Sequence, residues 1–281
     1  MEIQSEKIRD QQKSTWNDFS PMWKKWDDLL MKSLEPVGEE MIRLLDLKET
    51  DTVLDIASGT GEPGLSIAKC LKNGGIILTD LSENMLEIAR DHATKKEIGN
   101  IETRVCDACE LPFQDNTFNA VSCRLGFMFF PDMLEATKEM YRVLKPGGKI
   151  AASVWSVPES NFWATAISST IAKNMQLSPA PPQAPGLFRC AESGLLPHLF
   201  QQAGFKNVTE KEVSVQLNFE TVERYWTIIT EVTPPLAAAL NKADDAMKEK
   251  IKNEVYEVVN RKYPDGKVNI GGISLLISGE K

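Results

Sequence analysis

The sequence has no excess of positive charge. Its 32 Lys and Arg residues stand against 40 Asp and Glu residues, which gives a formal net charge of −8 at pH 7. Affinity for nucleic acid rests mainly on Lys and Arg side chains that displace counterions from phosphates. The acidic balance therefore argues against DNA or RNA as a partner.

Long apolar runs are also absent. The first thirty residues are rich in charge and contain no stretch of the kind that a secretory signal requires. The least charged stretch, 150–172, is interrupted by Pro158 and Glu159, which a membrane span would not tolerate cheaply. The five cysteines make an odd count in a chain of 281 residues, which fits reduced thiols. These features predict a cytoplasmic protein with no membrane span.

Short apolar runs alternate with longer amphipathic segments from residue 50 onward. This alternation is typical of βαβ units. The expected strands are residues 52–56, 75–79, 100–105, 118–123, 149–155, 206–217 and 273–277. The expected helices are residues 62–71, a segment that begins after Ser82 as N-cap, 132–144, 162–175 and 193–203, with a Pro-rich loop at 178–186. The pattern predicts an α/β fold with a doubly wound, mostly parallel, seven-stranded Rossmann-like sheet.

Three regions follow from this reading. Residues 1–47 are expected to form a cover of helices over one edge of the sheet, with an interruption at Pro36. Residues 48–156 are expected to form the nucleotide-binding core. Residues 157–281 are expected to complete the sheet and to add helical insertions on the substrate side, one of them at 220–262.

A glycine-rich turn follows the first expected strand. Residues 55–64 read DIASGTGEPG, which contains a G-x-G-x-x-G pattern and opens the next helix. Glycines at 59 and 61 let the backbone turn sharply and let a ligand approach the main chain. Open α/β sheets bind ligands at the carboxyl ends of their strands, so this turn is the expected cofactor loop.

Three carboxylates narrow the choice of cofactor. Asp80 follows the second strand, where it can accept hydrogen bonds from both ribose hydroxyls of either class of nucleotide. Asp55, at the mouth of the glycine loop, would repel a diphosphate, and Asp107 after the third strand adds a further negative charge. A ligand with a ribose, an adenine amino group, an ammonium and a sulfonium suits these groups better than one with phosphates. A nicotinamide-dependent oxidoreductase is the alternative from a different class.

Five motifs in this order resemble those of the class I S-adenosylmethionine-dependent methyltransferases, in the branch similar to the ubiquinone and menaquinone C-methyltransferases. They are VLDIASGTG at 53–61, TDLSENML at 79–86, CDACELPF at 106–113, FNAV at 118–121 and YRVLKPGG at 141–148. The resemblance covers about residues 50–156. It implies a methyltransferase that uses S-adenosylmethionine, releases S-adenosylhomocysteine and binds the cofactor within 48–156.

The resemblance also implies which residues hold the cofactor. They lie at the ends of the first four strands: Asp55, Ala57, Ser58, Gly59, Thr60 and Gly61 for the methionyl part, Asp80 for the ribose, Leu81, Met85, Asp107 and Ala108 for the adenine, and Arg124 and Leu125 beneath the methionine and the methyl group.

Aromatic residues gather before the first strand and after the fourth, two regions that border the methyl group in this family. We expect Trp16 at the methionyl end of the cofactor and Phe19, Trp26, Phe127 and Phe130 beside the acceptor. Residues 10–30 would then close over the site as a lid. The acceptor is predicted to be a small, partly apolar or aromatic molecule. A small amine held by cation–π contacts and methylated on nitrogen is the alternative within the family.

No residue is assigned to catalysis. Displacement at a sulfonium methyl group needs alignment and exclusion of water, and no obligatory base stands out. Cys106 and Cys109 lack a second pair or a nearby histidine, so no metal is assigned. His92 is expected at the surface, and His198 either there or facing the pocket as a base. A protein that binds the cofactor without catalysis, the atom that is methylated and the oligomeric state stay open, with a homodimer among the options.

Overall fold

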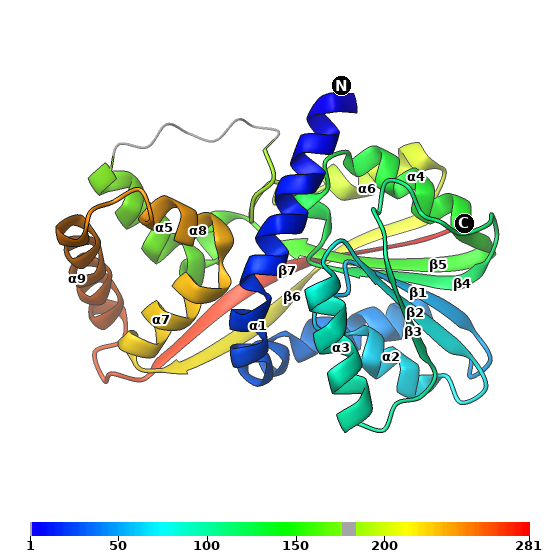
Figure 1. The fold of residues 1–281 in the computed structure, drawn as a ribbon, viewed down its shortest axis with the longest axis horizontal. Coiled ribbons are helices and arrows are strands. Elements are labelled where there is room, and N and C mark those ends of the chain that lie inside the picture. The colour runs from blue at the N-terminus through cyan, green and yellow to red at the C-terminus, as the bar shows by residue number, and fades with distance from the viewer. Residues whose placement is uncertain (1, 176–183) are drawn as a thin grey trace.

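The computed structural model describes residues 2–175 and 184–281, which contain a seven-stranded sheet (Figure 1). The strands are β1 Thr52–Ile56, β2 Gly75–Asp80, β3 Ile101–Val105, β4 Phe118–Arg124, β5 Leu144–Trp155, β6 Lys206–Glu220 and β7 Val268–Glu280. Their order across the sheet is β3-β2-β1-β4-β5-β7-β6. The pairs among β1 to β5 are parallel, and β7 is antiparallel to both β5 and β6. The sheet is therefore mostly parallel, as the sequence predicts.

The helices lie over the sheet and beyond its β6–β7 end (Figure 1). They are α1 Glu2–Leu45, α2 Gly64–Cys70, α3 Glu83–Lys95, α4 Met133–Val143, α5 Phe162–Met175, α6 Leu195–Ala203, α7 Val222–Val232, α8 Pro234–Leu240 and α9 Asp245–Lys262, with short 3₁₀ turns at Phe127–Phe129 and Pro158–Ser160. Ser82 begins α3 as predicted, because its hydroxyl accepts a hydrogen bond from the Met85 amide. None of the described helices is long and apolar enough to span a membrane.

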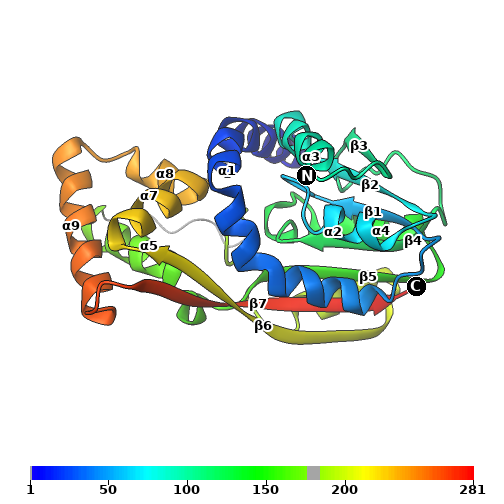
Figure 2. The same cartoon turned by 90° about the horizontal axis from the view of Figure 1, so that it is seen from below.

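The strands β6 and β7 extend past the rest of the sheet. β5 pairs with residues 274–280 of β7, whereas β6 pairs with β7 down to Val268. Residues 268–273 of β7 and residues 214–220 of β6 thus form a two-stranded ribbon beyond the end of β5. The helices α5, α7, α8 and α9 gather around this ribbon (Figures 1 and 2). Both strands are longer than predicted. Asn218 and the Gly271–Gly272 pair have weak strand propensity, and this hides the ribbon in the sequence.

The prediction that Pro36 interrupts the N-terminal helix is wrong. α1 continues through both Pro21 and Pro36. A proline removes one backbone donor and bends a helix, and Figure 2 shows that α1 changes direction along its course. Leu34 and Val37 on either side of Pro36 are buried, so packing against the sheet holds the helix together there. As a result, one bent helix packs on the sheet with its C-terminal part and lies beside α3 with its N-terminal part (Figure 2).

Other boundaries differ locally from the prediction. β5 begins at Leu144 and includes the Pro-Gly-Gly segment at 146–148, with an irregular register against β4. The segment at 220–262 contains the end of β6 and three separate helices, because Pro234 and Pro235 stand at the start of α8 and a short polar turn separates α8 from α9. Of the predicted Pro-rich loop at 178–186, residues 178–183 lie outside the described residues.

Gly64 begins α2 directly behind the glycine-rich turn. A Cβ at this position would lie 2.7 Å from Asp55 Oδ2 and would clash with the Leu78 side chain. Both neighbours belong to buried strands, so neither can move away freely. The third glycine of the G-x-G-x-x-G pattern is thus required for packing of the helix on the sheet.

We therefore expect Gly64→Ala to lower the free energy of unfolding by about 1–3 kcal/mol, the usual cost of overpacking. Urea denaturation followed by circular dichroism measures this change. Gly99→Ala is the matched control, since a Cβ at Gly99 meets no atom within 4 Å and should change stability by less than about 0.5 kcal/mol. Equal losses in the two variants would contradict the packing argument.

Candidate functional site

A large cavity lies at the carboxyl ends of the parallel strands, between the sheet, α1 and α7. It leaves about 1440 Å³ free of protein atoms, counted out to its open mouth. Twelve of the fourteen residues predicted to hold the cofactor line it: Trp16, Ala57, Ser58, Gly59, Thr60, Asp80, Leu81, Met85, Asp107, Ala108, Arg124 and Leu125. The other two, Asp55 and Gly61, lie behind its wall.

The glycine-rich turn, residues 57–61, is held in an unusual backbone conformation. Ala57, Gly59 and Gly61 all have positive φ angles, of 53°, 53° and 113°. The Gly59 amide donates a hydrogen bond of 3.0 Å to Asp80 Oδ2, and the Ser58 amide donates one of 2.9 Å to the Thr79 carbonyl. These bonds tie the turn after β1 to the end of β2. We call residues 57–61 the cofactor loop.

Two carboxylates stand along the wall next to this loop. Asp80 accepts hydrogen bonds from the amides of Gly59 and Ser82, and its burial raises its pKa above the ordinary value. Asp107 accepts a bond of 2.9 Å from the Cys109 amide, and its Oδ2 lies 3.8 Å from Arg9 on α1. The apolar side chains of Leu81, Met85 and Ala108 complete this part of the wall. Carboxylates beside apolar side chains suit a ligand that has ribose hydroxyls and a flat aromatic base.

Polar groups at the loop end of the cavity lack partners. Ser58 Oγ is buried and has no hydrogen-bond partner among the described residues. The Arg124 guanidinium is half-buried, and its Nη2 lies 2.9 Å from Met31 Sδ, with no described carboxylate at ion-pair distance. A hydroxyl without a partner and a guanidinium without a carboxylate partner fit the amino-acid end of S-adenosylmethionine, because its carboxylate can accept from both.

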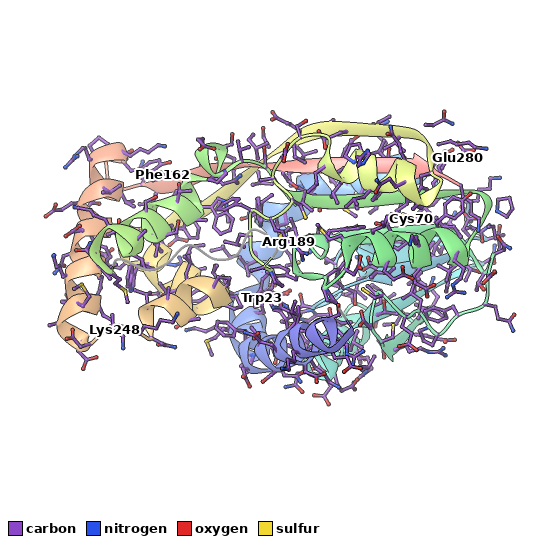
Figure 3. The ribbon with its side chains drawn as sticks, turned by 90° about the horizontal axis from the view of Figure 1, so that it is seen from above. Trp23, Cys70, Phe162, Arg189, Lys248 and Glu280 are labelled. Atoms are coloured by element: carbon purple, nitrogen blue, oxygen red, sulfur yellow. The ribbon has the colours of Figure 1, made fainter. Side chains whose placement is uncertain are left out.

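The other half of the cavity is almost entirely apolar. Its wall comes from α1, the turn after β4, the end of β5, α5, the segment before α6, β6, α7 and the start of α8: Trp23, Leu30, Leu34, Met128, Phe129, Phe130, Trp155, Trp163, Leu187, Leu217, Ile229, Val232 and Pro234. We call this part the apolar chamber. None of these wall residues can act as a base at neutral pH. In Figure 3, Trp23 lies where α1 passes beside the centre of the molecule.

Only one of the four aromatic residues predicted beside the acceptor lines this chamber. Phe130 does, whereas Phe127 is fully buried behind it and packs on Phe130 and Phe200. Phe19 is half-buried outside the cavity, and Trp26 turns away to donate a 2.7 Å hydrogen bond to Glu231 Oε2. A helix presents different residues at every position, so composition alone does not tell which aromatic faces inward.

Several residues of the site escaped the sequence analysis. Trp155 ends β5 at the same sheet edge as the cofactor loop, and the strand-end rule already used for Asp80 would have found it. Asp27 on α1 accepts a 2.6 Å hydrogen bond from the Thr60 hydroxyl, a contact that no local pattern signals. His92 is half-buried rather than at the surface, and its Nδ1 lies 3.1 Å from the Thr60 carbonyl oxygen. His198 is exposed and does not line the cavity.

Asp55 is fully buried beneath the cofactor loop. Its Oδ1 accepts a hydrogen bond of 2.6 Å from the Ser122 hydroxyl, and its Oδ2 has no partner among the described residues. Removal from water raises the pKa of Asp55 from its ordinary value of 3.8 to about 7. The folded protein therefore holds this proton at pH values where the unfolded chain has lost it.

This difference predicts how stability depends on pH. The contribution of Asp55 to the free energy of unfolding is fully present below about pH 4 and is lost as the pH rises to about 7. In this range the unfolded chain releases the proton of Asp55 more readily than the folded protein does, so a rise in pH favours unfolding. Between about pH 5 and pH 8 the wild-type free energy of unfolding should fall by about 1–3 kcal/mol more than that of Asp55→Asn. Urea denaturation of both proteins at the two pH values measures this. Parallel pH profiles would show that Asp55 does not cause the dependence.

Comparison with known proteins relates this geometry to a family. Residues 22–175 match the ubiE/COQ5 methyltransferase family. Demethylmenaquinone methyltransferase of Listeria monocytogenes is 32% identical over 186 residues, which cover 60% of this chain and 76% of the relative. Demethylmenaquinone methyltransferase of Bacillus cereus is 35% identical over 121 residues, which cover 43% of this chain and 51% of the relative.

Solved structures share the fold. The YcgJ protein of Bacillus subtilis aligns with a TM-score of 0.59 and 20% identity over 87% of this chain and 97% of its own. A phosphoethanolamine N-methyltransferase of Haemonchus contortus, solved with S-adenosylhomocysteine, aligns with a TM-score of 0.53 and 19% identity over 87% of this chain and 52% of its own.

These matches confirm the predicted fold class, and the family match overturns the oxidoreductase alternative. The chain belongs to the ubiE/COQ5 methyltransferase family and is an S-adenosylmethionine-dependent methyltransferase.

Proposed function

We propose that this enzyme methylates a small, largely apolar acceptor that binds in the apolar chamber. The observation that carries the proposal is the division of one cavity into two chemically different halves. Carboxylates, a guanidinium and a free hydroxyl line the half beside the cofactor loop, whereas aliphatic and aromatic side chains line the other half. Burial of an apolar molecule is favourable by about 25 cal/mol per Å² of surface, so such a chamber selects an apolar partner.

The cofactor is proposed to lie in the half of the cavity beside the cofactor loop, with its methyl group toward the apolar chamber. Ser58, the loop backbone and Arg124 would hold its amino-acid end, Asp80 its ribose and Asp107 its adenine amino group. When bound, S-adenosylmethionine supplies a methyl group on a sulfonium, which a nucleophile of the acceptor displaces in line. Trp16 on α1 stacks edge-on against Phe129 at 5.2 Å, which supports a place for it above the cofactor.

The protein contributes position and exclusion of water. α1 and α7 both line the chamber and lie against each other, and the Trp23 indole on α1 donates a 3.1 Å hydrogen bond to the Val232 carbonyl at the end of α7. A site that excludes water and holds two reactants in line can lower the activation free energy by several kcal/mol without a covalent role for the protein. The wall of the chamber offers no base, which favours an acceptor whose nucleophilic atom needs none.

Methylation of a small amine is less well supported. Among the described residues, the wall of the apolar chamber contains no carboxylate that could pair with an ammonium, and the carboxylates Asp80 and Asp107 of the same cavity are assigned to the cofactor. The curated relatives named for demethylmenaquinone also support an acceptor other than an amine.

The three regions of the chain are proposed to divide the work. Residues 1–47 cover the site, 48–156 hold the cofactor, and 157–281 complete the sheet and build the acceptor wall. The net charge of −8 supports a partner other than nucleic acid, and the five free cysteines support a reducing, cytoplasmic setting.

We expect Asp80→Ala to weaken binding of S-adenosylhomocysteine about tenfold or more, because charge-assisted hydrogen bonds contribute about 1.5–3 kcal/mol. Calorimetric titration measures the affinity. Asp245→Ala is the control, since the Asp245 side chain is fully exposed at the start of α9 and should leave binding unchanged. Unchanged affinity in Asp80→Ala would remove this carboxylate from the ribose site.

A charge in the apolar chamber should block the acceptor but not the cofactor. We expect Leu187→Asp, a half-buried position on the chamber wall, to abolish most methyl transfer while the affinity for S-adenosylhomocysteine changes less than about twofold. Mass spectrometry of apolar extract incubated with S-adenosylmethionine and enzyme detects compounds that gain the mass of one methylene group. Full turnover by Leu187→Asp would show that the acceptor binds elsewhere.

A further inference from the structure

A buried carboxylate joins α1 to the cofactor loop. Asp27 is 8% exposed, and its Oδ1 accepts a hydrogen bond of 2.6 Å from the Thr60 hydroxyl, which is itself buried. Asp27 does not line the cavity, so it does not touch a ligand there. Its effect on the site must therefore pass through Thr60.

Thr60 is held from two sides. Its hydroxyl is bound by Asp27 of α1, and its carbonyl oxygen lies 3.1 Å from His92 Nδ1 of α3. The residues on either side, Gly59 and Gly61, have positive φ angles, and glycine leaves such a segment free to move unless it is anchored. Thr60 is the point at which both helices fix the cofactor loop.

The groups around Asp27 offset only part of the free-energy cost of burying its carboxylate. Burial raises the pKa of Asp27, and the Thr60 hydroxyl, His92 and Lys96 oppose this shift, while Asp28 adds to it. His92 Nδ1 lies 3.7 Å from Asp27 Oδ2, and Lys96 is already paired with Glu62 at 2.9 Å. An apolar residue could pack α1 on the sheet without this cost, so simple packing does not account for a carboxylate here.

Two further polar contacts of α1 lie toward the adenosine end of the site, whereas Met31 of α1 contacts Arg124 at the loop end. Asn17 Oδ1 accepts a 2.7 Å hydrogen bond from the Ser82 hydroxyl beside Asp80, and Arg9 lies 3.8 Å from Asp107. Asp27 alone among the described polar residues of α1 hydrogen-bonds to the cofactor loop. The two ends of the cofactor are thus coupled to α1 through different residues.

We propose that Asp27 is a positioning residue that, through the Thr60 hydroxyl, sets the conformation of the cofactor loop and couples the seating of α1 to the amino-acid end of S-adenosylmethionine. This inference rests on the proposed function, which assigns that end of the cofactor to the loop. Loss of Asp27 should therefore weaken a ligand that has the amino-acid end and spare one that lacks it.

Two ligands separate these effects: S-adenosylhomocysteine and 5′-methylthioadenosine, which has no amino-acid part. Calorimetry on the full-length protein should show that Asp27→Ala binds S-adenosylhomocysteine about tenfold more weakly but changes the affinity for 5′-methylthioadenosine less than about threefold. Asp27→Asn should restore most of the affinity, because its amide oxygen still accepts from Thr60. Lys24→Ala is the control, since it removes an exposed pair between α1 and Asp91 and should change neither affinity.

A double-mutant cycle tests the route through Thr60. Thr60→Val should match Asp27→Ala, and the double variant should bind S-adenosylhomocysteine no more weakly than either single variant. Equal losses for both ligands, additive effects in the cycle, or an Asp27→Asn variant as weak as Asp27→Ala would each overturn the proposal. Should Asp27→Ala fail to fold, Thr60→Val takes its place: it should weaken S-adenosylhomocysteine and spare 5′-methylthioadenosine, while Asp27→Asn should bind both ligands nearly as wild type does. A wild-type protein that binds neither ligand would instead overturn the proposed function.

Discussion

The hydrogen bond between the Gly59 amide and the Asp80 carboxylate is the interaction on which the site depends. It joins the turn after β1 to the end of β2 and aligns the loop with the carboxylate proposed for the ribose. The other oxygen of Asp80 accepts from the Ser82 amide, and Ser82 in turn begins α3. Because α3 also brings His92 to Thr60, one carboxylate sets the loop, the start of a helix and the anchor beneath the loop.

Buried carboxylates are concentrated around this interaction. Asp27 and Asp55 are buried and Asp80 is half-buried at the cavity wall, and desolvation raises the pKa of each. A fold selected for stability alone would place apolar residues at such positions. Their presence beside the cofactor loop indicates that polar preorganisation of the site is maintained at the expense of stability, as is common where local rules are broken near function.

Local chemistry explains what could be predicted from the sequence. The first four strands, the glycine loop, Asp80 and the Ser82 cap follow from residues close together in the chain, and the structure places them as expected. The contacts of α1 could not be predicted, because the Asp27–Thr60 and Trp23–Val232 pairs join distant segments. For the same reason Phe19 and Trp26, predicted beside the acceptor, lie off the cavity wall. The continuity of α1 through Pro36 depends on buried neighbours that a local proline rule does not consider.

The ribbon formed by the outer parts of β6 and β7 has an evolutionary consequence. It joins the sheet only at its edge, through the pairing of β7 with β5, yet it carries α7 and α8, which contribute Ile229, Val232 and Pro234 to the proposed acceptor wall. Insertions or deletions between α7 and α9 can therefore accumulate without disturbing the register of β1, β2 or β4. Changes in this lobe would therefore alter the proposed acceptor wall while the turn after β1 and the end of β2 keep their positions.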